Sequence, residues 1–216
     1  MYDKIKHTGC IMEEYLVSAP PYLDYSWLME RLKNYASPRS KITQLIAKGD
    51  IVRIKKGLYL PGQLYNKSYS RSVLANLIYG PSYISLEYAL SYYGMTPERV
   101  ECVTSITTKR NKYFETEVGN FSYAYMPEKI YSVGIILKNT DDGSFFLATK
   151  EKALCDMIYR QKSLSTQQDF HNYLFQDLRI DEDIFMTLNK ELLYSITAIY
   201  KKNVLNRFYH YTKKVL

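Results

Sequence analysis

The segment SPRSKITQLIAKGDIVRIKKGLYLPG, Ser37 to Gly62, carries the clearest pattern in this chain of 216 residues. Ser37 can cap a helix by accepting a hydrogen bond from a free backbone N–H, and Pro38 suits the first helical position, where its missing N–H costs nothing. Apolar residues follow at helical spacing, and Gly49 can adopt the left-handed conformation that ends a helix. The segment therefore predicts a helix from Pro38 to Gly49.

After this helix the pattern changes to that of two short strands, residues 51–54 and 58–60. They are joined across Lys55-Lys56-Gly57, where Gly57 supplies the positive φ that a tight hairpin needs. This part of the sequence predicts a short hairpin with a basic tip.

Two further helices are expected ahead of Ser37. One covers residues 5–17, and the second begins near Asp24 or Ser26, either of which can cap it. Three helices and a hairpin within about 60 residues are typical of a winged helix-turn-helix, in which the third helix enters the major groove of DNA.

The face of the third helix that points away from its apolar stripe is polar. Gln44 can pair with an adenine edge, Ser40 and Thr43 can bond either base type, and cations can reach phosphates or guanine. The hairpin would place more cations against the phosphate backbone or in the minor groove. An ordinary solvated helix and hairpin is the alternative interpretation. The predicted DNA-binding residues are Arg39, Ser40, Lys41, Thr43, Gln44, Lys48, Arg53, Lys55 and Lys56.

Positive charge is concentrated in the same region. The formal net charge is +7, and residues 1–70 contribute 11 basic and 6 acidic side chains to it. Eight basic residues lie between Arg31 and Lys56, against Asp50 alone. This distribution places the positive field on the expected DNA-binding unit.

A length of 216 residues fits one large domain or two small ones. We expect two, a winged helix-turn-helix over residues 1–66 and a second domain over residues 67–216. The fold class expected is α+β, because the second domain alternates helical and strand patterns and should hold an antiparallel sheet followed by C-terminal helices. Helices are expected at 72–79, 86–93, 149–160 and from 167 to the end, and strands at 101–107, 113–117, 120–125 and 131–137.

The cysteines, Cys10, Cys102 and Cys155, lie far apart, so neither a disulfide framework nor a cysteine zinc site is indicated. The sequence shows neither a signal-peptide pattern nor a run that could span a membrane, which predicts a cytoplasmic protein.

Catalysis is not expected, and neither is a metal or cofactor. His7, His171 and His210 are scattered, without partners at metal-ligand spacing, and no phosphate-binding loop is present. A nuclease-like site built from Glu87, Glu115 and a lysine remains a minor alternative.

A second basic patch, Lys109, Arg110 and Lys112, is expected between two strands and ahead of an aromatic pair. It could extend the DNA footprint or meet an acidic partner, or it could be a solvated loop. The C-terminal residues 195–216 fit a docked helix, with a nucleic-acid contact or a dimer seam as alternatives.

Several blocks of the chain, in order, resemble the AbiEi family of abortive-infection antitoxins. They are KGDIVRIKKGLYLPG (48–62), ANLIYGPSYISLEYALSYYGMTPE (75–98), VTSITTKRNKYFET (103–116), NFSYAYMP (120–127) and LATKEKALCDMIY (147–159). The resemblance covers most of the chain.

The resemblance implies a transcriptional regulator of a type IV toxin–antitoxin system used in phage defence. An N-terminal winged helix would bind double-stranded operator DNA and repress its own operon. A C-terminal domain would counter a nucleotidyltransferase-like toxin without a tight complex. A homodimer or cooperative assembly on DNA would read two half-sites. The alternative is a protein-interaction antitoxin that binds the toxin directly and has little DNA-binding role.

Overall fold

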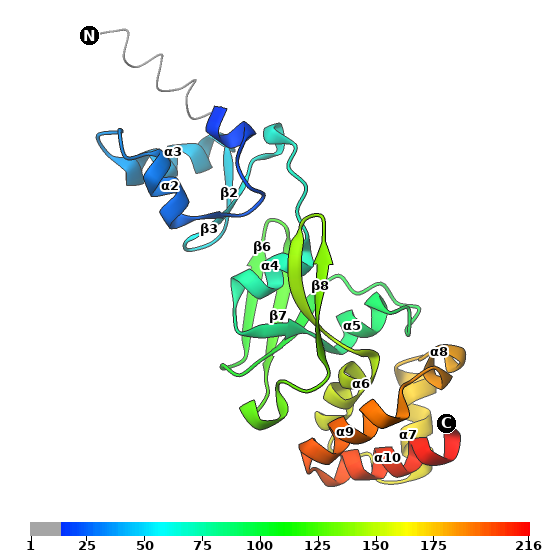
Figure 1. The fold of residues 1–216 in the computed structure, drawn as a ribbon. Coiled ribbons are helices and arrows are strands. Elements are labelled where there is room, and N and C mark those ends of the chain that lie inside the picture. The colour runs from blue at the N-terminus through cyan, green and yellow to red at the C-terminus, as the bar shows by residue number, and fades with distance from the viewer. Residues whose placement is uncertain (1–13) are drawn as a thin grey trace, which may run out of the picture. The chain divides into compact units, whose positions relative to one another are not determined.

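The structure is a computed structural model that describes residues 14–216. The chain divides into two compact units, Met1–Ser70 with Thr116–Val118 and Arg71–Glu115 with Gly119–Leu216 (Figure 1). The sequence placed this division after residue 66, a few residues earlier. Most of the helix expected over residues 5–17 lies outside the described residues; of that range, residues 14–17 are described and are helical.

The described part of the first unit combines helices with a small antiparallel sheet (Figure 1). The strand order is β1-β3-β2. Because α3 leads directly into β2, the polar helix and the hairpin follow one another along the chain. The elements are β1 (Leu23–Asp24), α2 (Tyr25–Arg31), α3 (Pro38–Lys48), β2 (Ile51–Lys55) and β3 (Leu58–Pro61).

The core of this unit is built from apolar side chains of every element. Leu28 of α2, Ile42 and Leu45 of α3, and Ile51 of β2 are all buried in one cluster. Since α3 contributes its apolar stripe to this cluster, the helix cannot rotate about its axis without exposing that stripe to water.

Two glycines set the junction between α3 and the hairpin. Gly49 ends the helix in the left-handed conformation, with φ 76°. A Cβ on Gly62 would lie 1.9 Å from the carbonyl oxygen of Gly49, and the Gly62 N–H donates to the Asp50 carbonyl at 2.8 Å. The end of β3 therefore packs so closely on the end of α3 that no side chain fits between them.

The second unit contains a six-stranded sheet of order β6-β7-β5-β4-β9-β8 with helices on it, so the fold as a whole is α+β. The sheet is mixed rather than antiparallel as expected, because β5 pairs with β7 and β4 with β9 in parallel. The sequence patterns also missed β4 and β9. The elements are α4 (Arg71–Ile78), β4 (Ser82–Ile84), α5 (Leu86–Tyr92), β5 (Val103–Thr107), β6 (Lys112–Thr116), β7 (Gly119–Tyr125), β8 (Ile135–Thr140), β9 (Gly143–Ala148), α6 (Lys150–Tyr159), α7 (Gln167–Asn172), α8 (Glu182–Met186), α9 (Lys190–Tyr200) and α10 (Asn203–Val215).

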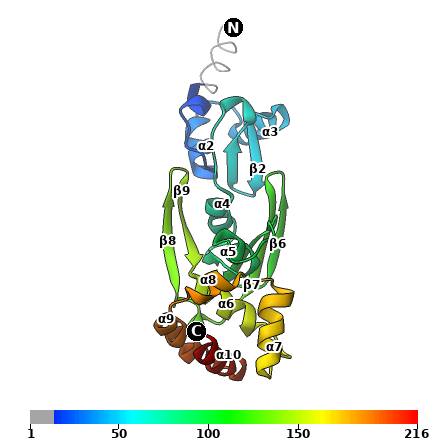
Figure 2. The same cartoon turned by 90° about the vertical axis from the view of Figure 1, so that its right-hand side faces the viewer.

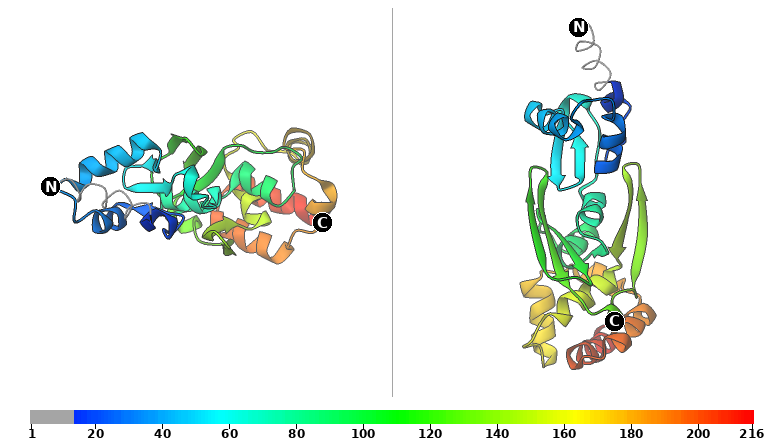
Figure 3. Two further views of the ribbon diagram at one scale, coloured as in Figure 1. Left: turned by 90° about the horizontal axis from the view of Figure 1, so that it is seen from above. Right: turned by 90° about the vertical axis from the view of Figure 1, so that its left-hand side faces the viewer.

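Within this unit the sheet opens into two arms. Figure 2 shows the β8–β9 hairpin on one side of α4 and α5 and strand β6 on the other, and the view from the opposite side in Figure 3 agrees. The helices α6 to α10 gather at the end of the unit that carries the C-terminus. The arms part where β4 and β9 pair at a single register, Ile84 opposite Leu147.

The C-terminal segment docks on the unit as two helices rather than one. Ile196 and Tyr200 of α9 and Val204 and Phe208 of α10 are buried, and Lys201 breaks the helix with φ 47°. Buried positions on both helices support the docked interpretation of this segment.

Candidate nucleic-acid interface

Helix α3 has one buried and one exposed side. Ile42 and Leu45 are 6% and 3% exposed. The side chains expected to contact bases, Ser40, Thr43 and Gln44, are exposed. The core of the first unit therefore holds α3 with its polar face outward.

The N-terminus of α3 is not capped as the sequence predicted. Ser37 occupies the capping position, but its side chain makes no capping hydrogen bond. Its Oγ instead lies 2.8 Å from Oγ of Ser40. The backbone of Ser37, with ψ 88°, departs from the extended geometry that directs a capping oxygen at the helix N–H groups. In α2, by contrast, Asp24 is the cap and accepts from the Trp27 N–H at 2.7 Å.

Three of the predicted contact residues have neighbours that restrict them. Arg39 Nε donates to the Tyr25 hydroxyl at 3.2 Å, and Thr43 Oγ1 donates to the Arg39 carbonyl at 3.3 Å. The ammonium of Lys41 lies 5.2 Å from the centre of the Tyr35 ring. These contacts lower the rotamer entropy that the side chains lose on binding a ligand.

The hairpin beside α3 carries cations at and before its turn. Arg53 and Lys56 are exposed and Lys55 is half-buried. The register shifts between Arg53 and Lys55, which marks a bulge, and Gly57 has φ 88° as the turn requires. The three cations therefore lie on the hairpin itself, two of them at the positions that flank or form the turn.

Tyr25 connects the two parts of this surface, and the sequence reasoning did not single it out. Its backbone N–H donates to the Gly57 carbonyl at the hairpin turn at 3.2 Å, while its hydroxyl accepts from Arg39 of α3. A tyrosine that follows a capping aspartate has no signature of this role in the sequence. Tyr25 thus positions the hairpin and one side chain of α3 relative to each other.

Basic side chains outnumber acidic ones on α3 and the β2–β3 hairpin. Of the eight basic residues from Arg31 to Lys56, Lys33 forms an ion pair with Glu30 at 2.6 Å. The hydrogen bond and charge of Lys33 lower the pKa of the Glu30 carboxyl. Arg31 stacks over Trp27 and Tyr15, with its guanidinium carbon 5.5 and 5.1 Å from the ring centres. The other six, Arg39, Lys41, Lys48, Arg53, Lys55 and Lys56, lie on α3 and the hairpin.

The second basic patch lies in the other unit, in the connection between β5 and β6. The Lys109 ammonium donates to the Gly80 carbonyl and lies 5.4 Å from the centre of the Tyr79 ring. Arg110 is exposed, and Lys112, the first residue of β6, lies 5.8 Å from the Phe114 ring. Lys109 and Arg110 border a shallow hollow, whereas Lys112 lines a different one. The three cations are therefore not a single cluster of free charges.

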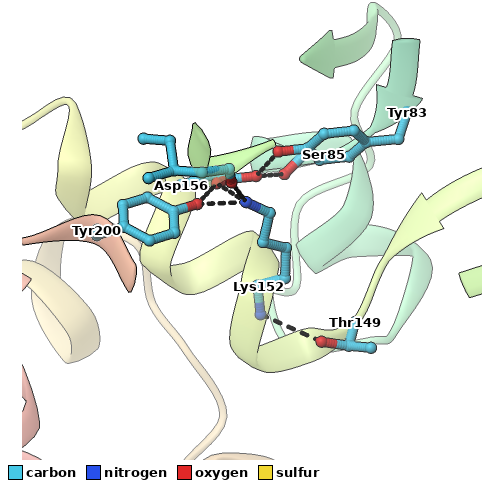
Figure 4. A network of polar contacts seen from close by, with 7 residues as sticks. Tyr83, Ser85, Thr149, Lys152, Asp156 and Tyr200 are labelled. Carbon is cyan, nitrogen blue, oxygen red and sulfur yellow. Dashed lines mark hydrogen bonds and ion pairs between the residues drawn. The ribbon is translucent and has the colours of Figure 1, made fainter. Parts of the chain in front are cut away.

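A buried polar network lies in the same unit and was not predicted (Figure 4). Asp156 of α6 accepts from the hydroxyls of Tyr83 at 2.9 Å and Ser85 at 2.7 Å, and also from Tyr200. Lys152, one turn earlier, lies 3.2 Å from Asp156 and donates to the Ile130 carbonyl at 2.8 Å. These bonds join α6 to β4, to the start of α5 and to α9.

The network also explains why the Ser85 side chain does not cap α5. Ser85 directly precedes this helix, at a position where a serine hydroxyl often caps, but its hydroxyl bonds Asp156 and not the helix. Lys152 and Asp156 are both fully buried, and burial lowers the pKa of Lys152 despite the neighbouring carboxylate. Burial and the Asp156 charge raise the pKa of Tyr83 and Tyr200 well above the usual value. The two phenols therefore act as neutral hydrogen-bond donors.

No helix within residues 14–216 combines the length and apolar character needed to cross a bilayer. In the same range, no three His, Cys, Asp or Glu side chains gather in a way that could hold a metal ion. His7 and Cys10 lie outside the described residues.

No protein-family model matches the sequence, and no curated protein sequence matches it. A solved structure does match the fold: the crystal structure of the RV2827C protein from Mycobacterium tuberculosis, with a TM-score of 0.62 and 14% sequence identity. The match covers 95% of this chain and 77% of that chain. At this identity the likeness shows a shared fold alone.

Proposed function

We propose that this chain is a sequence-specific DNA-binding antitoxin that represses its own toxin–antitoxin operon. In this proposal the first unit is a winged helix-turn-helix, with α3 as the recognition helix and the β2–β3 hairpin as the wing. The observation that carries it is the exposed polar face of α3, next in the chain to a hairpin with three cations. This arrangement supplies both base-reading side chains and phosphate contacts.

Each side chain has an assigned role. Gln44 reads an adenine edge in the major groove, and Ser40 and Thr43 bond neighbouring base edges. Arg39, held by Tyr25, reaches a phosphate or a guanine, while Lys55 and Lys56 contact the backbone beside the helix. Arg53, Lys41 and Lys48 add further phosphate contacts.

The second unit is proposed to counter a nucleotidyltransferase-like toxin, as the resemblance to AbiEi antitoxins implies. The proposal includes no catalytic role for the chain. Two copies would occupy two half-sites about one helical turn apart, or a multiple of that distance.

The experiment that tests repression is a mobility-shift titration with the DNA upstream of the chain's own gene, against a shuffled duplex of the same length and composition. Tighter binding to the upstream DNA at physiological salt supports the proposal. Equal binding to both duplexes would contradict sequence-specific recognition. Co-expression with the neighbouring gene product separates the rival function, because a stoichiometric complex that forms without DNA binding would identify a protein-interaction antitoxin.

A further inference from the structure

A hollow of about 500 Å³ opens in the second unit where the sheet divides. Strands β4 and β9 pair only at Ile84 and Leu147. Beyond that pair the N–H of Phe146 bonds the side-chain oxygen of Asn76 on α4, at 2.6 Å, instead of a neighbouring strand. Ser82, the first residue of β4, lines the hollow together with Asn76 and Phe146. A side chain thus replaces the missing strand contact and leaves space beside it.

Two polar groups that line this hollow have no partner within the described chain. The side-chain nitrogen of Asn76 and the hydroxyl of Ser82 are both buried without a hydrogen bond, and Ser82 is only 3% exposed. Because the Asn76 oxygen already accepts from Phe146, its nitrogen is left as a donor. Buried polar groups are nearly always bonded, so an unpaired donor and hydroxyl at one hollow indicate a site for a missing partner.

The remaining walls are mostly apolar, with the Tyr131 phenol and Ser132 as polar groups, and among the described residues carry no charged side chain. Tyr131, Ile135 and Phe146 line the hollow, and Phe146 is 50% exposed to solvent. Burial raises the pKa of Tyr131 to about 12, so its phenol is uncharged at neutral pH. The described residues that line the hollow include no acidic or basic side chain. A charged ligand would lose its hydration here without an opposite charge to replace it.

We propose that this hollow binds a small, neutral, flat molecule with an amide or carbonyl group. The carbonyl oxygen accepts from the Asn76 nitrogen and the Ser82 hydroxyl, while the flat body packs against Phe146 and Ile135. The volume lies within the range of ordinary small-molecule sites. The site is independent of the proposed DNA-binding function, because all the residues that line it belong to the second unit.

Benzamide is the minimal probe, because it combines a flat ring with one neutral amide. Titration of the full chain, followed by ¹⁵N NMR, should shift the Asn76 side-chain amide and the Phe146 backbone amide and should saturate at roughly 1–10 mM, as expected for a fragment of this size. Benzoate, which has the same shape and a negative charge, should bind at least about 10-fold more weakly. Absence of saturation, or equal binding of benzoate, would overturn the proposal.

Two serine variants test the role of the Ser82 hydroxyl, both through benzamide binding and through the thermal stability of the free protein. Ser82→Ala should weaken benzamide binding at least about 5-fold. The same change should leave the thermal midpoint of the free protein unchanged or raised, since it removes an unpaired buried hydroxyl. Ser144→Ala on β9 is the matched control, because its hydroxyl is exposed and bonded to Asn139 at 2.7 Å; it should leave benzamide binding unchanged. A lowered thermal midpoint for Ser82→Ala would mean that the Ser82 hydroxyl already has a hydrogen-bond partner in the free protein. The hydroxyl would then not be available to a ligand, which would contradict the proposed site.

Discussion

Removal of the two lysines at the hairpin turn tests the proposed DNA contact most directly. Lys55→Ala with Lys56→Ala deletes two of the six cations that lie on α3 and the hairpin. Binding to duplex DNA releases condensed counterions, so the logarithm of the association constant falls by about 0.9 per phosphate contact for each tenfold rise in salt. Six contacts per chain predict a slope of about −5.4, and the double variant should bring it to about −3.6.

The same relation gives the expected loss of affinity. If the two lysines act only by counterion release, binding at about 0.15 M salt should weaken about 30-fold, and at about 0.05 M about 200-fold, relative to a 1 M reference. The loss should be similar for operator and shuffled duplexes, because phosphates carry no sequence information. Fluorescence anisotropy over a salt series measures both quantities.

The matched control removes the same charge elsewhere. Lys213→Ala with Lys214→Ala changes two exposed lysines at the end of α10, in the other unit. It should leave the slope near that of the unaltered protein. An equal change of slope in both double variants would refute a specific role for the hairpin and would indicate an effect of net charge alone.

The remaining predictions concern base recognition, the buried network and the end of α3. Gln44→Ala should cost about 1–3 kcal/mol on the preferred operator and relax the preference at particular base pairs, as competition with single-base variants of the operator would show; an unchanged preference at every position would exclude Gln44 from base reading. Asp156→Asn should lower the free energy of unfolding by about 3–5 kcal/mol in urea titrations, because it leaves the Lys152 ammonium buried without its carboxylate. A loss below about 1 kcal/mol would show that water reaches the Lys152–Asp156 pair in the folded protein. Gly49→Ala should cost about 1–2 kcal/mol for its left-handed backbone, whereas Gly62→Ala should cost more, since its Cβ would meet the Gly49 carbonyl at 1.9 Å; the opposite order of melting temperatures would contradict the close approach.

The ends of helices and the position of the hairpin turn can be predicted from the sequence where they depend only on neighbouring residues. The ends of α3 follow from Pro38 and Gly49, and the hairpin turn follows from Gly57, because a fixed φ or a left-handed backbone acts within a few residues. The start of α6 likewise follows from Thr149, whose hydroxyl accepts from the Lys152 N–H as a helix cap. The helical spacing of the apolar residues also predicts that Gln44 lies on the exposed side of α3.

Tertiary structure decided what depends on residues far apart in the chain. The sequence pattern of β5 and β7 does not reveal that they pair in parallel, and β4 is too short to show a period of its own. Ser37 and Ser85 both precede helices, yet their hydroxyls bond other partners, because a capping hydrogen bond competes with whatever the fold brings near. The role of Tyr25 depends on its hydrogen bond to the Gly57 carbonyl. The role of the Lys152–Asp156 pair depends on the bond from the Tyr83 hydroxyl to Asp156. In both cases only the folded chain brings the two partners within hydrogen-bonding distance. Short-range backbone preferences are properties of the sequence itself, whereas long-range pairing and burial depend on which distant segments pack together.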